Sequence, residues 1–153
     1  MNTKEHLKHL FEYNDWANRR IVAALRSAPS EKALSYLSHV LLTEREYYDR
    51  LYGKDSTGFD FWRALKLDEC SEAAQVNAQI YEDLLAKFDD EGLGQTIRYY
   101  TSSGEAVKNT YREILSHVLL HSMNHRGQIL TILRQEEIEP PVLDYIIYCR
   151  QQP

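Results

Sequence analysis

Apolar residues recur at three- and four-residue steps in four long segments of this chain. The segments run over about 4–26, 31–52, 71–88 and 111–135. This spacing places side chains on one face of an α-helix, and such a face is stable when it packs against other helices. The sequence therefore predicts four amphipathic helices and an all-α, four-helix-bundle fold.

Residues that begin or end helices separate these segments. Ser30 offers an N-cap hydroxyl to the second helix, and Gly53 follows its last turn. The pair Pro140-Pro141 prevents the fourth helix from continuing. We expect the apolar stretch 142–148, which follows the two prolines, to dock back on the bundle.

Two connections differ in character from the helical segments. Residues 95–110 place β-branched and aromatic residues before the turn sequence Ser102-Ser103-Gly104, which predicts a short β-hairpin before the last long helix. Residues 53–70 contain an aromatic cluster that is too apolar for a free linker and is expected to pack across the bundle, with a short turn of helix as one form it can take. Such a cluster can line a substrate pocket, complete a core or lie in a homodimer interface.

Length and composition narrow the class of protein. A chain of 153 residues, 43% hydrophobic and 27% charged, is typical of one globular domain, which we expect to span residues 1–153. A net charge of -5 argues against a nucleic-acid-binding surface. We see no signal peptide, membrane span or disulfide framework, so we expect a cytoplasmic protein. No GxGxxG motif or P-loop supports a nucleotide cofactor.

Three of the six histidines lie on the last long helical segment at four-residue spacing. They are His117, His121 and His125. Two histidines at i and i+4 share one helical face and can chelate one metal ion. His125 falls within the apolar arc of this segment and His121 at its edge, whereas His117 falls further out. Spacing alone more often indicates buried, hydrogen-bonded histidines than a metal site. Two ligands also do not complete a metal site, so the pair needs a further ligand.

The residue pattern does not decide which residue is the third ligand. The two cysteines are too few for a structural thiolate site, so an open site with a bound water is the more natural arrangement. His39 lies well away from the apolar stripe of its own helix, and periodicity does not select it. The competing ligands are His6, His9, Glu44 and Glu46.

Several motifs together resemble the DinB/YfiT-like superfamily. They are the run YNDWANRR at 13–20, His39 followed by Glu44, the run HVLLHSMNHRGQ at 117–128, and Pro140-Pro141 followed by Asp144-Tyr145. The third run is the most specific of these. The resemblance extends over essentially the whole chain.

This resemblance implies a four-helix bundle, usually dimeric, that holds one divalent metal on three histidines. Carried over to this chain, the ligands are His39, His121 and His125. We expect zinc or nickel, although imidazole also suits copper and iron. Some members of the family are thiol-dependent transferases or isomerases, which implies a metal-dependent transferase or hydrolase for a small molecule, with a low-molecular-weight thiol as one reactant. The alternatives are a non-catalytic metal- or ligand-binding bundle that acts through homodimer or partner contacts, and a metal-free interaction module.

Four polar residues near these motifs have roles that the pattern leaves open. Glu44 is either a ligand, a carboxylate that orients a metal-bound imidazole, or a solvated surface residue. Gln128, three residues after His125, is better placed than Arg126 to reach the metal site, and Arg126 is otherwise a surface arginine. Asn14 shares the apolar stripe of the first helix and would need a buried partner. No catalytic residue can be assigned from the sequence.

Overall fold

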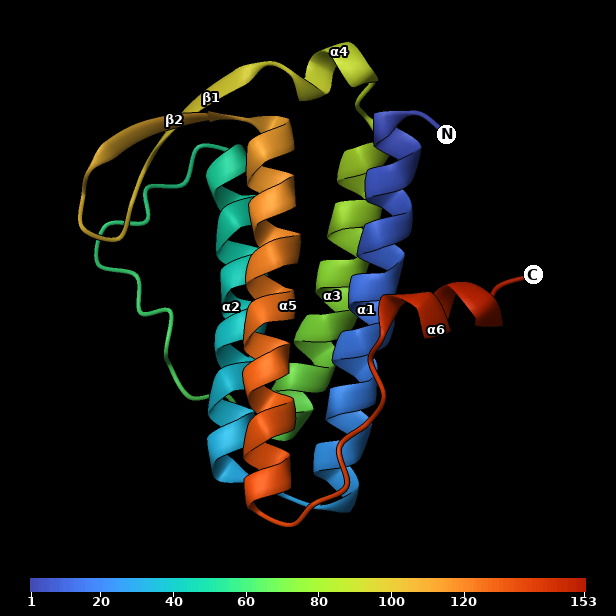
Figure 1. The fold of residues 1–153 in the computed structure, drawn as a ribbon. Helices are drawn as coiled ribbons and strands as arrows, with labels where there is room; N and C mark the ends of the chain where they lie inside the picture. The colour runs from blue at the N-terminus through green and yellow to red at the C-terminus, as the bar shows by residue number, and fades with distance from the viewer.

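The computed structural model describes residues 1–153 as a four-helix bundle with a β-hairpin before the last long helix, which confirms the predicted fold class (Figure 1). The elements are α1 (Thr3–Ser27), α2 (Glu31–Leu51), α3 (Leu67–Ala86), α4 (Asp90–Leu93), β1 (Thr96–Tyr100), β2 (Ala106–Thr110), α5 (Tyr111–Gln135) and α6 (Tyr145–Gln151). The hairpin is antiparallel, with Thr96 paired to Thr110 and Tyr100 to Ala106. None of the helices combines the length and apolar character needed to cross a bilayer.

Side-chain caps define where the long helices begin. Asn2 accepts a hydrogen bond from the backbone N–H of Glu5 at 2.9 Å, and the Glu5 carboxylate accepts one from the Asn2 N–H at 3.0 Å. Thr110 and Glu113 form the same reciprocal pair at the start of α5. Ser30 caps α2, as predicted. These caps satisfy backbone donors that have no partner within the helix.

The start of α3 differs from the sequence-based expectation. The helix begins at Leu67 rather than at Ser71, because the Glu69 carboxylate accepts the Lys66 N–H at 3.1 Å and starts the helix one turn earlier. Cys70 is therefore helical and fully buried. The acidic run after α3 forms α4, with Asp89 as its N-cap, rather than ending α3 itself.

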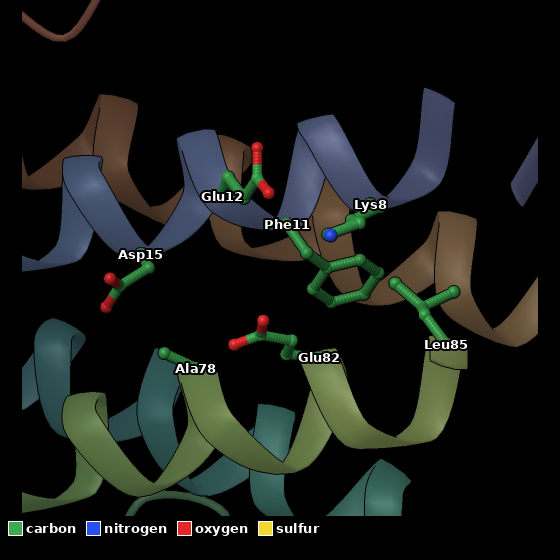
Figure 2. A pocket seen from close by; sticks show the side chains of 7 residues that line it. All are labelled: Lys8, Phe11, Glu12, Asp15, Ala78, Glu82 and Leu85. Atoms are coloured by element: carbon green, nitrogen blue, oxygen red, sulfur yellow. The ribbon is translucent and has the colours of Figure 1, made fainter. Parts of the chain in front are cut away.

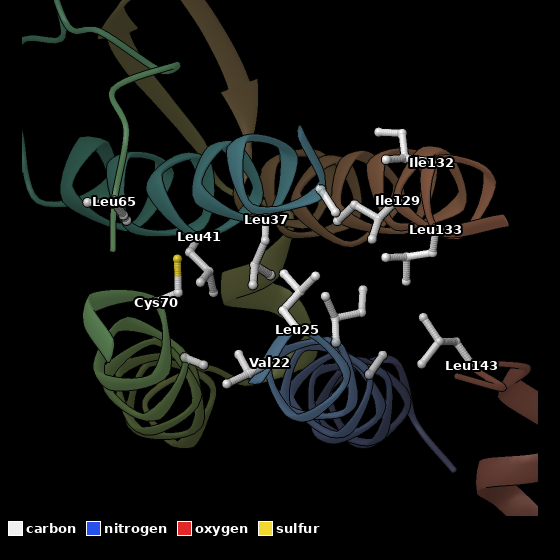
Figure 3. Close-up of a cluster of buried hydrophobic side chains, with 14 of the residues drawn as sticks. Val22, Leu25, Leu37, Leu41, Leu65, Cys70, Ile129, Ile132, Leu133 and Leu143 are labelled. Carbon is white, nitrogen blue, oxygen red and sulfur yellow. The ribbon is translucent and has the colours of Figure 1, made fainter. Parts of the chain in front are cut away.

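The apolar core is divided into two clusters along the bundle. Helix α2 lies beside α5, and α1 lies beside α3 (Figure 1). One cluster, shown in Figure 3, includes Leu25, Leu37 and Leu133 and fills the end near the α1–α2 turn. The other includes Phe11 and Leu115 and fills the end near the hairpin. Burial of these side chains supplies the main driving force for the bundle.

A layer of buried polar side chains lies between the two apolar clusters. Glu44 on α2, which is 1% exposed, accepts hydrogen bonds from Asn14 of α1 at 2.7 Å, Asn77 of α3 at 3.0 Å and Ser122 of α5 at 2.9 Å. One carboxylate therefore bonds side chains from the three other long helices. Because a buried carboxylate is stable only when its acceptor positions are satisfied, these contacts specify how the helices align.

The positive charge of this layer comes from Arg126 on α5. Its guanidinium donates to the Asn14 Oδ1 at 2.6 Å and to the Asn18 Oδ1 at 2.9 Å, and the side chain is 2% exposed. The two asparagines in turn donate to Glu44, so opposite charges are linked through amides. Asn14 has the buried partners that its position requires, whereas the interpretation of Arg126 as a surface arginine is wrong.

The outer face of α2 is covered by the connection between α2 and α3. Residues 52–66 run along this face, and the hairpin turn meets them where the Gly58 N–H donates to the Ser102 carbonyl at 2.9 Å (Figure 1). The expected packing of this aromatic connection is confirmed, although it contains turns and no helix. The chain after Pro140-Pro141 also docks as expected, because the Tyr13 hydroxyl donates to the Leu143 carbonyl at 2.6 Å.

We predict that Asn14→Ala lowers the free energy of unfolding by about 2 kcal/mol, because it removes a partner from both a buried carboxylate and a buried guanidinium. Urea denaturation followed by circular dichroism measures this change. The control is Gln79→Ala, which removes an exposed amide that bonds Asp83 on the surface of α3 and should change stability by less than about 0.5 kcal/mol. Equal effects of the two substitutions would contradict the role assigned to the polar layer.

Candidate metal centre

Three histidine rings from α2 and α5 meet on the side of this helix pair that the aromatic connection covers. The Nε2 atoms of His39 and His121 are 3.0 Å apart. The His125 ring centroid lies 4.6 Å from that of His39 and 4.4 Å from that of His121. Each residue offers one ring nitrogen, and the three nitrogens lie within 4.8 Å of one another. The structure thus brings together all three histidines that the family resemblance selected.

The donor set matches the requirements of a divalent metal ion. Zinc binds imidazole nitrogen at about 2.0–2.1 Å with tetrahedral geometry, so two ligating nitrogens lie about 3.3 Å apart. The His39 and His121 Nε2 atoms, 3.0 Å apart, are close to this value, and all three nitrogens lie within 4.8 Å of one another. Three nitrogens also leave a fourth tetrahedral position for water or a substrate atom, which is the composition of a catalytic rather than a structural zinc site.

Hydrogen bonds on the opposite ring nitrogens orient two of the imidazoles. The His39 Nδ1 lies 2.8 Å from the Phe61 carbonyl and the His125 Nδ1 lies 2.5 Å from the Gln128 Oε1. Because both partners are oxygen acceptors, each Nδ1 carries the proton and each Nε2 presents a lone pair. Gln128 contacts His125 as its three-residue spacing predicts. The indole of Trp62 stacks on His39, with ring centroids 3.7 Å apart.

His121 is the most perturbed of the three histidines. Burial, followed by the proximity of the other histidines, lowers the pKa of His121 to about 3. Burial also lowers the pKa of His39, against an opposing contribution from its bond to Phe61. The His121 Nδ1 is buried and has no hydrogen-bond partner in the protein. Both rings are neutral near pH 7, and neutral imidazole is the form that binds metal.

The competing ligands from the sequence are engaged elsewhere. His6 is exposed near the start of α1, and His9 packs against the aromatic rings of α6. Glu44 bonds the buried polar layer. Glu46 accepts from Lys54 at 2.7 Å and from a buried serine. None of these four residues joins the histidine cluster.

A pocket of about 530 Å³ opens beside His39 and His121. Thr43 and Arg50 line it from α2, and His117 lines it from α5, one turn before His121. Sequence reasoning missed Thr43 and Arg50 as members of the site. The signal was present, because they follow His39 by four and eleven residues and so share its helical face.

A second, smaller crevice lies between α1 and α3, as Figure 2 shows. Its volume is about 120 Å³, and Lys8, Glu12, Asp15 and Glu82 contribute its polar groups. It contains no histidine, and the bundle separates it from the three imidazoles. The pocket beside His39 and His121 is therefore the one that adjoins metal-binding chemistry.

Comparison with known proteins agrees with this geometry. The model of the DinB family matches residues 1–153. The chain belongs to the DinB family. It is similar to Protein DinB of Bacillus subtilis (strain 168), with 30% identity over 159 residues that cover 91% of each chain. As a DinB-family protein it combines the helical bundle with three histidines that are placed to hold a divalent metal ion.

We predict that the metal-free protein loses stability as the pH falls below about 6.5. Burial lowers the pKa of His121 from 6.5 to about 3 in the folded protein. Between pH 6.5 and pH 3 the unfolded chain therefore binds a proton at His121 that the folded chain does not bind, which favours unfolding. The contribution is at most about 1.4 kcal/mol per pH unit. Urea denaturation in a chelator at pH 7 and pH 5 measures it.

The control for this measurement is His121→Gln, which removes the titrating ring. Its free energy of unfolding should fall less steeply between pH 7 and pH 5 than that of the unsubstituted protein. Equal pH dependence of the two proteins would contradict a depressed pKa at His121.

Proposed function

We propose that this DinB-family protein is a metal-dependent transferase or hydrolase for a small molecule, with zinc or nickel held by His39, His121 and His125. The observation that carries the proposal is the convergence of three imidazole nitrogens within 4.8 Å at the wall of an open pocket. Imidazole ligands suit both metals. The attacking group is a low-molecular-weight thiol or a water molecule.

Three neutral ligands leave the full charge of a bound divalent ion uncompensated. When bound, such an ion acts as a Lewis acid that lowers the pKa of a coordinated water or thiol. The residues of the chain position the ligands: the Phe61 carbonyl and Gln128 fix the protonated nitrogens of two rings, and Trp62 covers one face of His39. This arrangement holds the donors ready before the ion arrives.

His117 is the residue of the pocket that can accept a proton. Its ring centroid lies 5.7 Å from that of His121, and it lines the same pocket. Burial, together with the nearby charge of Arg50, lowers the pKa of His117. A neutral imidazole at this position can take the proton that a thiol or water releases during attack.

We predict about one equivalent of metal in the untagged protein, and loss of that metal in His121→Ala and His39→Ala. Each substitution leaves only two of the three protein ligands, one fewer than an open zinc site uses, so metal binding should weaken. Plasma mass spectrometry after loading with zinc or nickel and exhaustive dialysis measures the content. His117→Ala is the matched control, because it removes a histidine of α5 outside the triad and should keep one equivalent.

The outcome that contradicts this assignment is unchanged metal content in both ligand variants, or a protein that takes up neither ion.

A cobalt-loaded sample distinguishes an open metal site from a closed one. A small thiol such as 2-mercaptoethanol should produce a new near-ultraviolet thiolate-to-cobalt absorption if the fourth position is open. Absence of this band would favour the second function below.

The second function is a non-catalytic metal- or ligand-binding bundle. It is favoured by the scarcity of acids in the pocket, because Asp60 is the one carboxylate that lines it. Asp60 is exposed to solvent, and its carboxylate accepts a hydrogen bond from the Trp62 N–H at 2.9 Å. No serine or cysteine nucleophile adjoins the three imidazoles at hydrogen-bonding distance. In this function the metal stabilises the bundle, and chelation lowers the melting temperature without any loss of catalysis.

A homodimer is part of the proposal, together with a cytoplasmic location and the absence of nucleic-acid contacts. Leu120 and Met123 on α5 are 61% and 51% exposed, and Gly127 continues the same helical face with open space above it. This face can accept a second helix.

We predict that Leu120→Glu converts a dimer to a monomer, as measured by light scattering after size exclusion. The control is Gln128→Glu, which lies on a different face of α5 and should leave the dimer intact. A monomeric wild-type protein would contradict the proposed dimer.

A further inference from the structure

Arg50 is a buried charge in the wall of the pocket without a carboxylate partner. The side chain is 3% exposed and lines the pocket. Its Nε donates to the Ser56 Oγ at 2.7 Å, but no protein atom accepts a hydrogen bond from its two terminal nitrogens. No aspartate or glutamate oxygen lies within 4.0 Å of it. A buried guanidinium in this state is costly unless something outside the protein completes it.

The acid that Arg50 reaches through Ser56 is already neutralised by another residue. Glu46, one turn before Arg50 on α2, is paired with Lys54 at 2.7 Å and accepts from Ser56 at 2.8 Å. The serine thus connects the arginine to the carboxylate without cancelling its charge. The positive charge of Arg50 remains available to the pocket.

Aromatic rings hold the guanidinium in place. The central carbon lies 4.5 Å from the ring centroid of Tyr47, 5.4 Å from that of Phe61 and 5.3 Å from that of Tyr99. Aromatic rings attract a cation through their faces, which steadies the charge. They do not replace oxygen acceptors for the N–H groups in the guanidinium plane, which match the two oxygens of a carboxylate.

Thr43 contributes an unsatisfied polar group to the same wall. Its side chain is 2% exposed, its Oγ1 is buried without a hydrogen-bond partner, and the residue lines the pocket. On α2 it lies four residues after His39 and seven before Arg50. Buried polar atoms without partners are rare, and the two found here, the Thr43 Oγ1 and the His121 Nδ1, belong to residues that both line this pocket, which indicates a ligand with polar atoms of its own.

We propose that Arg50 binds the carboxylate of the small molecule whose other end reaches His39 and His121, and that Thr43 bonds a polar group between the two ends. This inference rests on the proposed function for the identity of the reacting end. A carboxylate fits better than a phosphate, because a single unpaired guanidinium matches one negative charge and the chain as a whole carries a net charge of -5.

The helix sets the length of this molecule. Eleven residues of α-helix separate His39 from Arg50, a rise of about 16 Å, and the arginine side chain leans back toward the N-terminus of the helix, which shortens the span to about 10 Å. The pocket volume of about 530 Å³ is within the usual range for a small-molecule site. The preferred class is an elongated thiol or electrophile with a terminal carboxylate.

The test compares two probes that differ only at the far end, 8-mercaptooctanoate and 8-mercapto-1-octanol. Calorimetric titration of the zinc-loaded full-length protein should show at least tenfold tighter binding of the carboxylate. Arg50→Gln should abolish this preference and leave the affinity for the alcohol unchanged. The matched control is Arg45→Gln, which removes an exposed arginine of α2 that pairs with Asp49, and should keep the preference.

The same titration on metal-free protein separates this inference from the proposed function. If the metal site fails, both probes lose the affinity contributed by their thiol, yet the preference for the carboxylate persists because Arg50 is intact. Equal binding of the two probes, or a preference that survives in folded Arg50→Gln, overturns the inference. Circular dichroism establishes folding of the variant.

Thr43→Val provides a test that keeps Arg50 and the fold. It replaces an unsatisfied hydroxyl with a methyl group of similar size, so thermal stability should be unchanged or higher. Binding of a carboxylate probe with a central polar group, N-(3-mercaptopropanoyl)-4-aminobutanoate, should weaken about threefold, whereas 8-mercaptooctanoate should bind as before. Lower stability with unchanged binding of both probes would overturn the role of Thr43.

Discussion

The alignment of the four long helices depends on the bonds that link Glu44 to Arg126 across the bundle. Either charge alone would be too costly to bury, and together they require the amides of α1 and α3 and the hydroxyl of Ser122 as intermediaries. Apolar packing tolerates small shifts along a helix axis, whereas directed hydrogen bonds to one carboxylate do not. This polar layer therefore determines the register in which α2 meets α5.

That register positions the candidate metal centre. Ser122 and Arg126 each follow a metal-site histidine by one residue, and His39 lies five residues before Glu44 on α2. Successive residues on a helix point about 100° apart, so one set faces the polar layer while the other faces the aromatic connection. The bonds that hold the interior of the bundle together thus also hold the three imidazole nitrogens within reach of one ion.

The opposite side of the site is made by irregular chain. Residues 52–66 contribute the Phe61 carbonyl that orients His39 and the Trp62 ring that covers it, and the hairpin turn closes against this segment. The same segment forms part of the pocket that contains the unpaired guanidinium of Arg50. A rigid helical pair thus supplies the ligands, and a surface connection supplies the enclosure, a division of roles that is common in binding sites.

The sequence by itself determined the four helices, the Ser30 cap and the hairpin, because periodicity, the Ser30 hydroxyl and the turn at Ser102-Ser103-Gly104 act over a few residues. It also selected His121 and His125, which share one helical face. Only the tertiary structure decided that Arg126 is buried, and it alone showed why His39, which was selected by family resemblance, faces the other two imidazoles. Arg126 is buried because its charge finds partners on another helix, and His39 is covered by chain that follows its own helix. Local spacing contains no information about contacts between segments distant in sequence.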